Sequence, residues 1–378
     1  MRGEKERFVS AKWSLYYQLL KLCVPVFCFQ TTEASLSDLL LQQMELATPV
    51  MAYVYGEDES KDELTLLAAI ENSGKQEDTK NADIEISADA QKANGDEEET
   101  QDPIAAAGAE NVAAAATPVW TKQAEVNRDK LLDFDYLVKN FYRIDRTTTI
   151  DSSELNPGQL LAKDLTIDTN VGGPVILIYH THSQEGFVDS DGSEGMTVMG
   201  LGDRLTSLLQ DTYGIPVLHH RGKYDVDGRD YAYSNAEPEI RQVLADNPTI
   251  QVVIDLHRDG VGDDVHLVTD IGGKQTAKIM FFNGLSRTTS TGPIDYLQNP
   301  NLQDNLATSL QMQIAAAELY PGFTRPVFLK GYRYNMHMCP KSMLIEVGAQ
   351  TNTFEEVYNA MDPLANILAY VLLGQSHT

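Results

Sequence analysis

The sequence predicts an α/β domain in which a mixed, largely parallel central sheet is flanked by helices. Continuous apolar runs of strand length, such as residues 175–179 and 342–347, are typical of strands that are covered on both faces. Amphipathic stretches of helical length, such as residues 196–213, separate these runs. Strands and helices alternate in this way to the end of the chain, which is the pattern of α/β proteins.

Each predicted element has a local reason in the sequence. Apolar and aromatic residues at helical spacing predict the helices, and short apolar runs predict the strands. The predicted helices cover residues 133–142, 196–213, 237–245, 302–319 and 354–373. The predicted strands cover residues 175–179, 215–218, 251–256, 277–282, 326–329 and 342–347.

The charge of the chain is concentrated in one segment. The 378 residues carry 55 acidic and 29 basic side chains, which gives a net charge of −26. Residues 57–117 contain 17 of these acids and only 4 of the bases, so half of the net charge lies there. A segment with so much charge and so little to bury cannot offset the entropy cost of folding. We therefore predict an acidic disordered linker at residues 57–118 and a folded domain at residues 119–378.

The overall composition excludes two classes of protein. Nucleic-acid binding needs clustered Lys and Arg, and the acidic balance of this chain argues against it. The three cysteines are too few for a disulfide scaffold or a cysteine-rich zinc module. We expect no nucleic acid among the partners.

The first 56 residues form a separate N-terminal region. Basic residues at its start precede an apolar stretch at residues 13–29, which Lys21 and Pro25 interrupt. A basic start followed by a short apolar run is typical of an export signal or membrane anchor. We predict that the chain reaches a membrane through this segment; a cytosolic amphipathic helix is the alternative.

Three of the predicted strands lead into polar side chains that can carry chemistry. In open α/β sheets, ligands bind outside the carboxyl ends of the strands. Because the ends of parallel strands meet at one edge, we expect these side chains to lie close together. The side chains are His180, His182, Glu185, His257, Arg258 and Glu346.

A zinc site is the chemistry that these residue types favour. His182 and Glu185 have His-x-x-Glu spacing in the turn after a strand, and His257 completes a His₂Glu set, a known ligand set for catalytic zinc. Such a site leaves a position open for water, whose pKa zinc lowers toward roughly 7. His180 is the alternative to His182, because both side chains point to the same side if the chain stays extended. Otherwise His180 orients a ligand or stabilises the transition state.

Two further residues have predicted roles at the same edge. Glu346 is the candidate general base, because a carboxylate inside an apolar strand is costly unless a nearby cation keeps it ionised. Arg258 directly follows a predicted ligand and is placed to hold a substrate carboxylate or a developing oxyanion. The structural alternatives are an ion pair between Glu346 and a buried arginine, and a salt bridge from Arg258 to Asp255 or Asp259.

Five motifs in this order resemble the stage II sporulation protein P family of cell-wall hydrolases. The resemblance spans roughly residues 131–370. The motifs are ILIYHTHSQEGF (residues 176–187), GRDYAYSN (228–235), VIDLHRDG (253–260), YPGFTRP (320–326) and LIEVGAQTNT (344–353).

The resemblance implies a fold like that of the zinc-dependent N-acetylmuramoyl-L-alanine amidases, which is distantly similar to zinc carboxypeptidases. It implies that residues 119–378 form a catalytic domain that cleaves the amide between the muramoyl lactyl group and L-alanine of peptidoglycan, with an additional endopeptidase activity on cross-links. By the same resemblance, His182, Glu185 and His257 lie in the motifs that supply zinc ligands, and Glu346 lies in the motif that supplies the catalytic carboxylate.

The family also implies a cellular setting. It acts during forespore engulfment with stage II sporulation proteins D and M, from a membrane-anchored head. The catalytic domain would then lie outside the cytoplasm, in the forespore intermembrane space.

Two alternative functions remain open at this point. A zinc carboxypeptidase would use Arg258 to bind a terminal carboxylate. A membrane-tethered module would bind peptidoglycan without cleaving it. Glu346 favours an enzyme, because a pure binder has no need of a carboxylate in a buried strand end.

Overall fold

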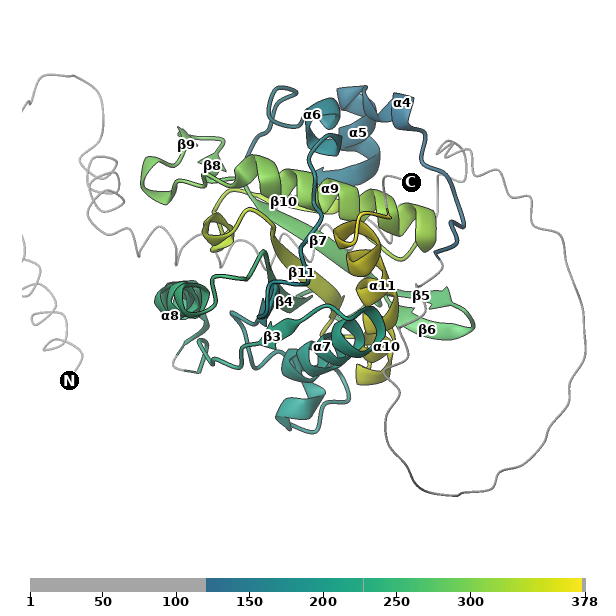
Figure 1. Cartoon of the computed structure of the whole chain (residues 1–378), viewed down its shortest axis with the longest axis vertical. Coiled ribbons are helices and arrows are strands. Elements are labelled where there is room, and N and C mark those ends of the chain that lie inside the picture. The colour runs from purple at the N-terminus through teal and green to yellow at the C-terminus, as the bar shows by residue number, and fades with distance from the viewer. Residues whose placement is uncertain (1–119, 227, 376–378) are drawn as a thin grey trace, which may run out of the picture. The chain divides into compact units, whose positions relative to one another are not determined.

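A mixed sheet lies at the centre of the fold (Figure 1). The computed structural model describes residues 120–226 and 228–375, so the predicted N-terminal region and acidic linker lie outside the description. Within the described residues the sheet has seven strands. They are β1 (Tyr142–Ile144), β2 (Ile176–Tyr179), β3 (Val217–His219), β4 (Val252–Asp259), β7 (Ile279–Gly284), β10 (Val327–Lys330) and β11 (Ser342–Ala349).

Helices surround this sheet, and two small two-stranded sheets lie outside it. The hairpins pair β5 (Val268–Ile271) with β6 (Lys274–Ala277), and β8 (Arg287–Thr288) with β9 (Gly292–Pro293). No helix in residues 120–226 or 228–375 is both long and apolar enough to cross a bilayer. The α-helices are α4 (Arg128–Leu131), α5 (Phe134–Phe141), α6 (Pro157–Leu161), α7 (Val198–Tyr213), α8 (Ala232–Asp246), α9 (Leu302–Leu319), α10 (Phe354–Asn359) and α11 (Met361–Leu372).

The strand order confirms the predicted mixed, largely parallel sheet. The order is β1-β10-β7-β11-β4-β2-β3, and every neighbouring pair is parallel except β11 with β7. The strands β2, β4 and β11 therefore run in one direction. Their carboxyl ends meet at one edge, as expected from the positions of the polar strand ends.

The two faces of the sheet pack against different helices. On one face, the even-numbered side chains of β2 and β4, such as Ile178 and Leu256, belong to the large core cluster that includes residues of α7, α9 and α11. On the other face, the odd-numbered side chains of these strands, such as Leu177 and Val253, pack against Ile240 and other residues of α8. Successive side chains of a strand point to opposite faces, so the odd-numbered residues of β4 beyond Val253 lie on the α8 face.

The predicted helices agree with the observed ones in position but not always in extent. The helix predicted at residues 302–319 matches α9. The single closing helix predicted at residues 354–373 is wrong, because the structure divides it into α10 and α11 at Ala360. Pro363 explains the division: it has no N–H to donate to the carbonyl of Asn359, and its ring clashes with that carbonyl.

Helix α8 begins five residues before the predicted start at Glu237. It continues through Pro238 in its interior, where a proline costs about 3 kcal/mol. Burial of Ala232, Tyr233 and Ala236 offsets this cost. The early start matters for the site, because it brings Tyr233 to the carboxyl edge of the sheet.

Candidate active site

The turn that follows β2 is fastened to its surroundings by two buried carboxylates. Asp255 on β4 accepts hydrogen bonds from Thr181 N at 2.8 Å and Thr181 Oγ1 at 2.6 Å. Asp225 accepts hydrogen bonds from Ser183 Oγ at 2.7 Å and from the backbone N–H of Gln184 at 3.2 Å. These bonds hold the chain in a compact turn, so that His182 and Glu185 face the end of β4.

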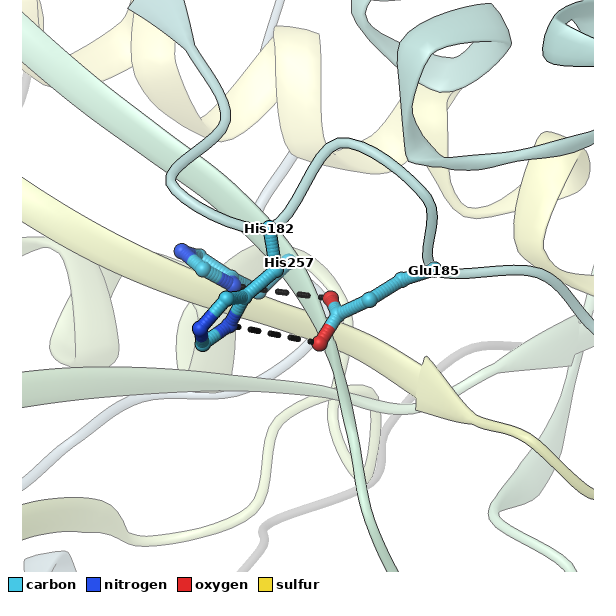
Figure 2. Close-up of side chains that lie close together, drawn as sticks. All are labelled: His182, Glu185 and His257. Carbon is cyan, nitrogen blue, oxygen red and sulfur yellow. Dashed lines mark ion pairs between the residues drawn. The ribbon is translucent and has the colours of Figure 1, made fainter. Parts of the chain in front are cut away.

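Three buried side chains that can donate a ligand atom to a metal ion converge at this point (Figure 2); they are called the donor set below. His182 Nδ1 lies 3.6 Å from Glu185 Oε1, and His257 Nδ1 lies 3.4 Å from Glu185 Oε2. One ligand atom from each residue lies within 4.8 Å of the others. The structure thus brings together the predicted His₂Glu set, from the turn after β2 and from β4.

The chemistry of these donors fits a metal ion of the zinc type. Two imidazole nitrogens and a carboxylate are ligands that zinc uses in catalytic sites. Both imidazoles turn Nδ1 toward Glu185, and all three side chains are buried. His182, Glu185 and His257 are therefore the residues that could hold the ion.

The charges of the three donors are mutually dependent. Burial alone would raise the pKa of Glu185, but its contacts with His182 and His257 outweigh burial and hold the pKa well below its usual range. Burial alone would lower the pKa of His257, but Asp255 and Glu185 raise the pKa well above its usual range. In the absence of a metal ion, the Glu185 carboxylate thus has its counter-charge on His257, while burial lowers the pKa of His182.

Asp255 is a functional candidate that the sequence analysis considered only as a partner for Arg258. His257 Nε2 lies 2.7 Å from Asp255 Oδ1, on the side of the ring away from Glu185. Histidines that bind a metal usually have a carboxylate or carbonyl on their other nitrogen, which sets the tautomer and the ring orientation. The signal was present in the sequence, because residues two apart on a strand share a face.

We expect Asp255→Asn to weaken zinc binding by about 10–100-fold, the usual effect of losing such a partner. Competition against a chromophoric chelator measures this affinity. Asp203→Asn is the matched control, because Asp203 Oδ1 lies 2.8 Å from His219 Nδ1 in a similar pair outside the donor set. An unchanged affinity in Asp255→Asn, or an equal loss in the control, would contradict the role of Asp255.

Glu346 lies beside the donors on the neighbouring strand. It pairs with His257 in the parallel register of β11 and β4, so the two side chains share the α8 face. Its Oε2 is buried and has no hydrogen-bond partner in the described part of the chain. Burial and the negative charge of Asp259 raise the pKa of the Glu346 carboxyl to about 8. A cation held by the neighbouring donors would lower this pKa, so that the carboxylate could accept a proton at neutral pH.

Arg325 is a largely buried arginine beside the carboxyl groups of Glu346 and Asp259. Its Nη1 donates to Asp259 Oδ2 at 2.5 Å. Its positive charge lowers the pKa of Glu346, but by less than Asp259 raises it. Arg325 thus forms an ion pair with Asp259, and its charge also acts on Glu346.

The structure places His180 away from the three donors. The chain does not stay extended after His180 but bends at Thr181, so the condition under which His180 and His182 would point to the same side is not met. His180 Nδ1 lies 2.7 Å from the Leu256 carbonyl, and its Nε2 lies 2.9 Å from His219 Nε2. Burial and the neighbouring His219 lower the pKa of His180 to about 3. Of the two alternatives, His182 is the one that joins Glu185 and His257.

Arg258 uses its guanidinium within the protein. Its Nε donates to the Gly186 carbonyl at 3.0 Å, and its Nη1 donates to the Asp259 carbonyl at 3.1 Å. Its backbone N–H donates to Glu185 Oε2 at 2.9 Å. Within the described chain the guanidinium thus bonds to carbonyls rather than to the carboxylates of Asp255 or Asp259. Arg258 fixes the second oxygen of Glu185 through its backbone.

Arg229, which the sequence analysis did not single out, reaches the donor set from a different direction. It begins the 3₁₀-helix η3 (Arg229–Tyr231), and its Nη2 donates to Glu185 Oε1 at 2.7 Å. The preceding Gly228 has φ of 143°, a conformation that favours glycine. This contact joins residues 44 positions apart, and no local spacing in the sequence indicates it.

Tyr233 packs against both histidines of the donor set. Its ring is stacked on His257 with centroids 6.4 Å apart, and the edge of His182 meets it at 5.6 Å. Burial against an aromatic ring restricts the imidazoles to one orientation. The first turn of α8 therefore forms a wall of the site.

The fold and the donor set define an α/β protein with a candidate metal centre at the carboxyl edge of its sheet. The chain belongs to the stage II sporulation protein P (SpoIIP) family, whose family model matches residues 35–369. This match confirms the resemblance seen in the motifs. A curated relative, stage II sporulation protein P of Bacillus subtilis (strain 168), is 26% identical over 227 residues. The matched stretch is 55% of this chain and 53% of the relative, so the chain spans about half the length of that relative.

Solved structures similar to this chain include two amidases. N-acetylmuramoyl-L-alanine amidase AmiC2 of Nostoc punctiforme has a TM-score of 0.34 and 12% sequence identity, over 55% of this chain and 99% of that chain. N-acetylmuramoyl-L-alanine amidase from Clostridium difficile 630 has a TM-score of 0.32 and 13% identity, over 55% of this chain and 98% of that chain.

Proposed function

We propose that this chain is a zinc-dependent peptidoglycan hydrolase that cleaves the N-acetylmuramoyl-L-alanine amide, with an additional endopeptidase activity on peptide cross-links. The observation that carries the proposal is the convergence of His182, Glu185 and His257 beside the buried carboxyl group of Glu346, which pairs with His257 in the sheet register. Membership of a sporulation family supports a role in the cell wall during sporulation.

The proposed mechanism assigns a distinct role to each group. Zinc held by His182, Glu185 and His257 would supply the positive charge that polarises the scissile carbonyl and acidifies the attacking water. Glu346 takes the proton of that water and passes it to the leaving nitrogen of L-alanine. Asp255 orients His257 through its contact with the Nε2 atom of the ring. Arg229 and the backbone N–H of Arg258 hold the two oxygens of Glu185.

The proposed cellular setting follows from the family rather than from the site. We propose that the chain acts during forespore engulfment with stage II sporulation proteins D and M. Its catalytic domain would lie in the forespore intermembrane space, with the N-terminal segment providing the membrane attachment. The carboxypeptidase alternative is less well supported, because the guanidinium of Arg258 is bonded to backbone carbonyls.

We expect the full chain to release peptides with a free N-terminal L-alanine from purified peptidoglycan. Mass spectrometry of the products identifies the scissile bond, and a parallel digestion with chelator tests the metal. The proposal would be supported if a chelator stops the release of these peptides and added Zn²⁺ restores it. Cleavage only between stem peptides would move the assignment to an endopeptidase, and intact peptidoglycan in the presence of zinc-loaded protein would favour a binding module.

A further inference from the structure

The guanidinium of Arg229 lies at the boundary between the donor set and solvent. One of its nitrogens, Nη2, is bonded to Glu185, whose side chain is 1% exposed, while the Arg229 side chain itself is 46% exposed. The guanidinium therefore extends from the buried donor set to the surface of the protein. A group in this position touches a proposed metal ligand and can also touch what binds from outside.

Most of the hydrogen-bonding capacity of Arg229 is unused by the protein. Arginine has five N–H donors in a planar fork that matches a carboxylate. One bond to Glu185 Oε1 is the hydrogen bond that the described residues provide to this guanidinium. Arg258 and Arg325, the other arginines at this edge, donate to Gly186 and to Asp259. Arg229 thus keeps N–H donors that can bind an external anion, on a guanidinium that also faces the charge of Glu346.

The surface beside Arg229 also suits a bound peptide. Val226 and Tyr231 lie three and two residues from Arg229, and they are 58% and 49% exposed. Both side chains are therefore available for contact with a peptide that the guanidinium binds.

The substrate class follows from where the anion must lie. In the proposed reaction the leaving group is the nitrogen of L-alanine, and the next residue of the peptidoglycan stem is D-isoglutamate or its amide. Its α-carboxylate lies about one residue, roughly 3.3–3.6 Å of extended chain, beyond L-alanine. This carboxylate is the first anionic group on the peptide side of the scissile amide, and Arg229 contacts the donor set directly through its hydrogen bond to Glu185.

We propose that Arg229 recognises the free α-carboxylate of the second stem residue and so makes the protein selective for peptidoglycan with D-isoglutamate over D-isoglutamine. This inference rests on the proposed amidase function. The guanidinium would then bind Glu185 on one side and the substrate carboxylate on the other. Replacing the carboxylate by an amide removes the charge and one acceptor oxygen, and it places N–H donors opposite N–H donors.

The test compares two purified peptidoglycans that differ only in amidation of this α-carboxylate. We expect the wild-type full chain to cleave the free-acid form with a kcat/KM about 10–100-fold higher, mainly through a lower KM, as for a charged hydrogen bond. Arg229→Gln should remove this preference, and Arg229→Lys should retain part of it. Arg204→Gln is the matched control, because Arg204 pairs with Asp362 on the surface of α7 and α11.

Bound zinc, measured in every variant, separates the outcomes. A wild type without preference for the free acid would overturn the inference. An Arg229→Gln variant that keeps the preference would also overturn it. If kcat of that variant is lowered equally on both substrates, the result would indicate that Arg229 stabilises the oxyanion. Loss of zinc from both Arg229 variants, with the preference unchanged in the remaining zinc-loaded protein, would reduce Arg229 to a positioning residue for Glu185. If the wild type cleaves neither peptidoglycan, the proposed amidase function itself fails.

Discussion

Glu346→Gln is expected to lower the rate of peptidoglycan hydrolysis by about 10²–10⁴-fold, the usual contribution of a general acid–base group. Glutamine has the same shape but cannot take a proton from water or return one to the leaving nitrogen. The loss should appear in kcat, because the binding contacts of the substrate stay in place. Initial rates of peptide release from purified peptidoglycan measure it.

The same substitution should leave the metal site and the fold intact. Glu346 is not one of the three donors, so zinc content should match that of the wild type. Its charge is disfavoured by burial, so the neutral glutamine should not destabilise the protein. Glu355→Gln, an exposed residue in the first turn of α10, is the matched control. Wild-type turnover in zinc-loaded Glu346→Gln would remove Glu346 from the mechanism.

The pH dependence of stability gives an independent measure of the environment of Glu346. The pKa of this carboxyl is about 8 in the folded, metal-free protein, against an ordinary value of 4.5. Between these values the folded state holds a proton that the unfolded chain has released, so stability falls as pH rises from about 4.5 to about 8. Chelated wild type should therefore lose stability relative to chelated Glu346→Gln over this range, as followed by denaturant unfolding.

His257→Ala is expected to have the second large effect, on metal affinity and on stability. Removing one of three ligands should weaken zinc binding by more than the roughly 10–100-fold expected for Asp255→Asn. In the metal-free protein, the loss of His257 also leaves Asp255 and Glu185 buried without its counter-charge. Breaking a buried pair from one side costs about 3–5 kcal/mol.

Two measurements on the same preparations check this prediction. Zinc content after dialysis reports the site, and thermal unfolding in chelator reports the buried charges. His219→Ala is the matched control, since His219 is similarly buried and also faces a carboxylate, that of Asp203. A full zinc load in His257→Ala would make His257 a structural residue, and equal destabilisation in both variants would attribute the loss to cavity formation alone.

Local patterns were sufficient to predict most of the longer elements, but not the order of the strands in the sheet. Apolar runs identified β2, β4 and β11, and the polar residues at their ends indicated where a site would form. The period of a strand is short, so these patterns are complete within a few residues. The exceptions included helix ends, where Pro363 divides the last helix and tertiary burial carries α8 through Pro238. The short elements α4, α6 and β1 and the two hairpins were not predicted.

The candidate donors were predicted because chain direction limits where they can go. His182, Glu185, His257 and Glu346 all follow or end parallel strands, which places them at one edge of the sheet without knowledge of any contact. The choice between His180 and His182 was different. It depended on a turn that Asp225 and Asp255 stabilise from 42 and 74 residues away.

The sequence by itself determined the fold class, the family and the set of candidate donor residues, because these depend on residue type and short spacing. Only the tertiary structure decided the environment of each group. It showed Asp255 behind His257, Asp259 beside Glu346, and Arg229 between Glu185 and solvent. Burial and charge act through space, so the protonation of Glu346 and the exposure of Arg229 depend on residues that are distant in the chain.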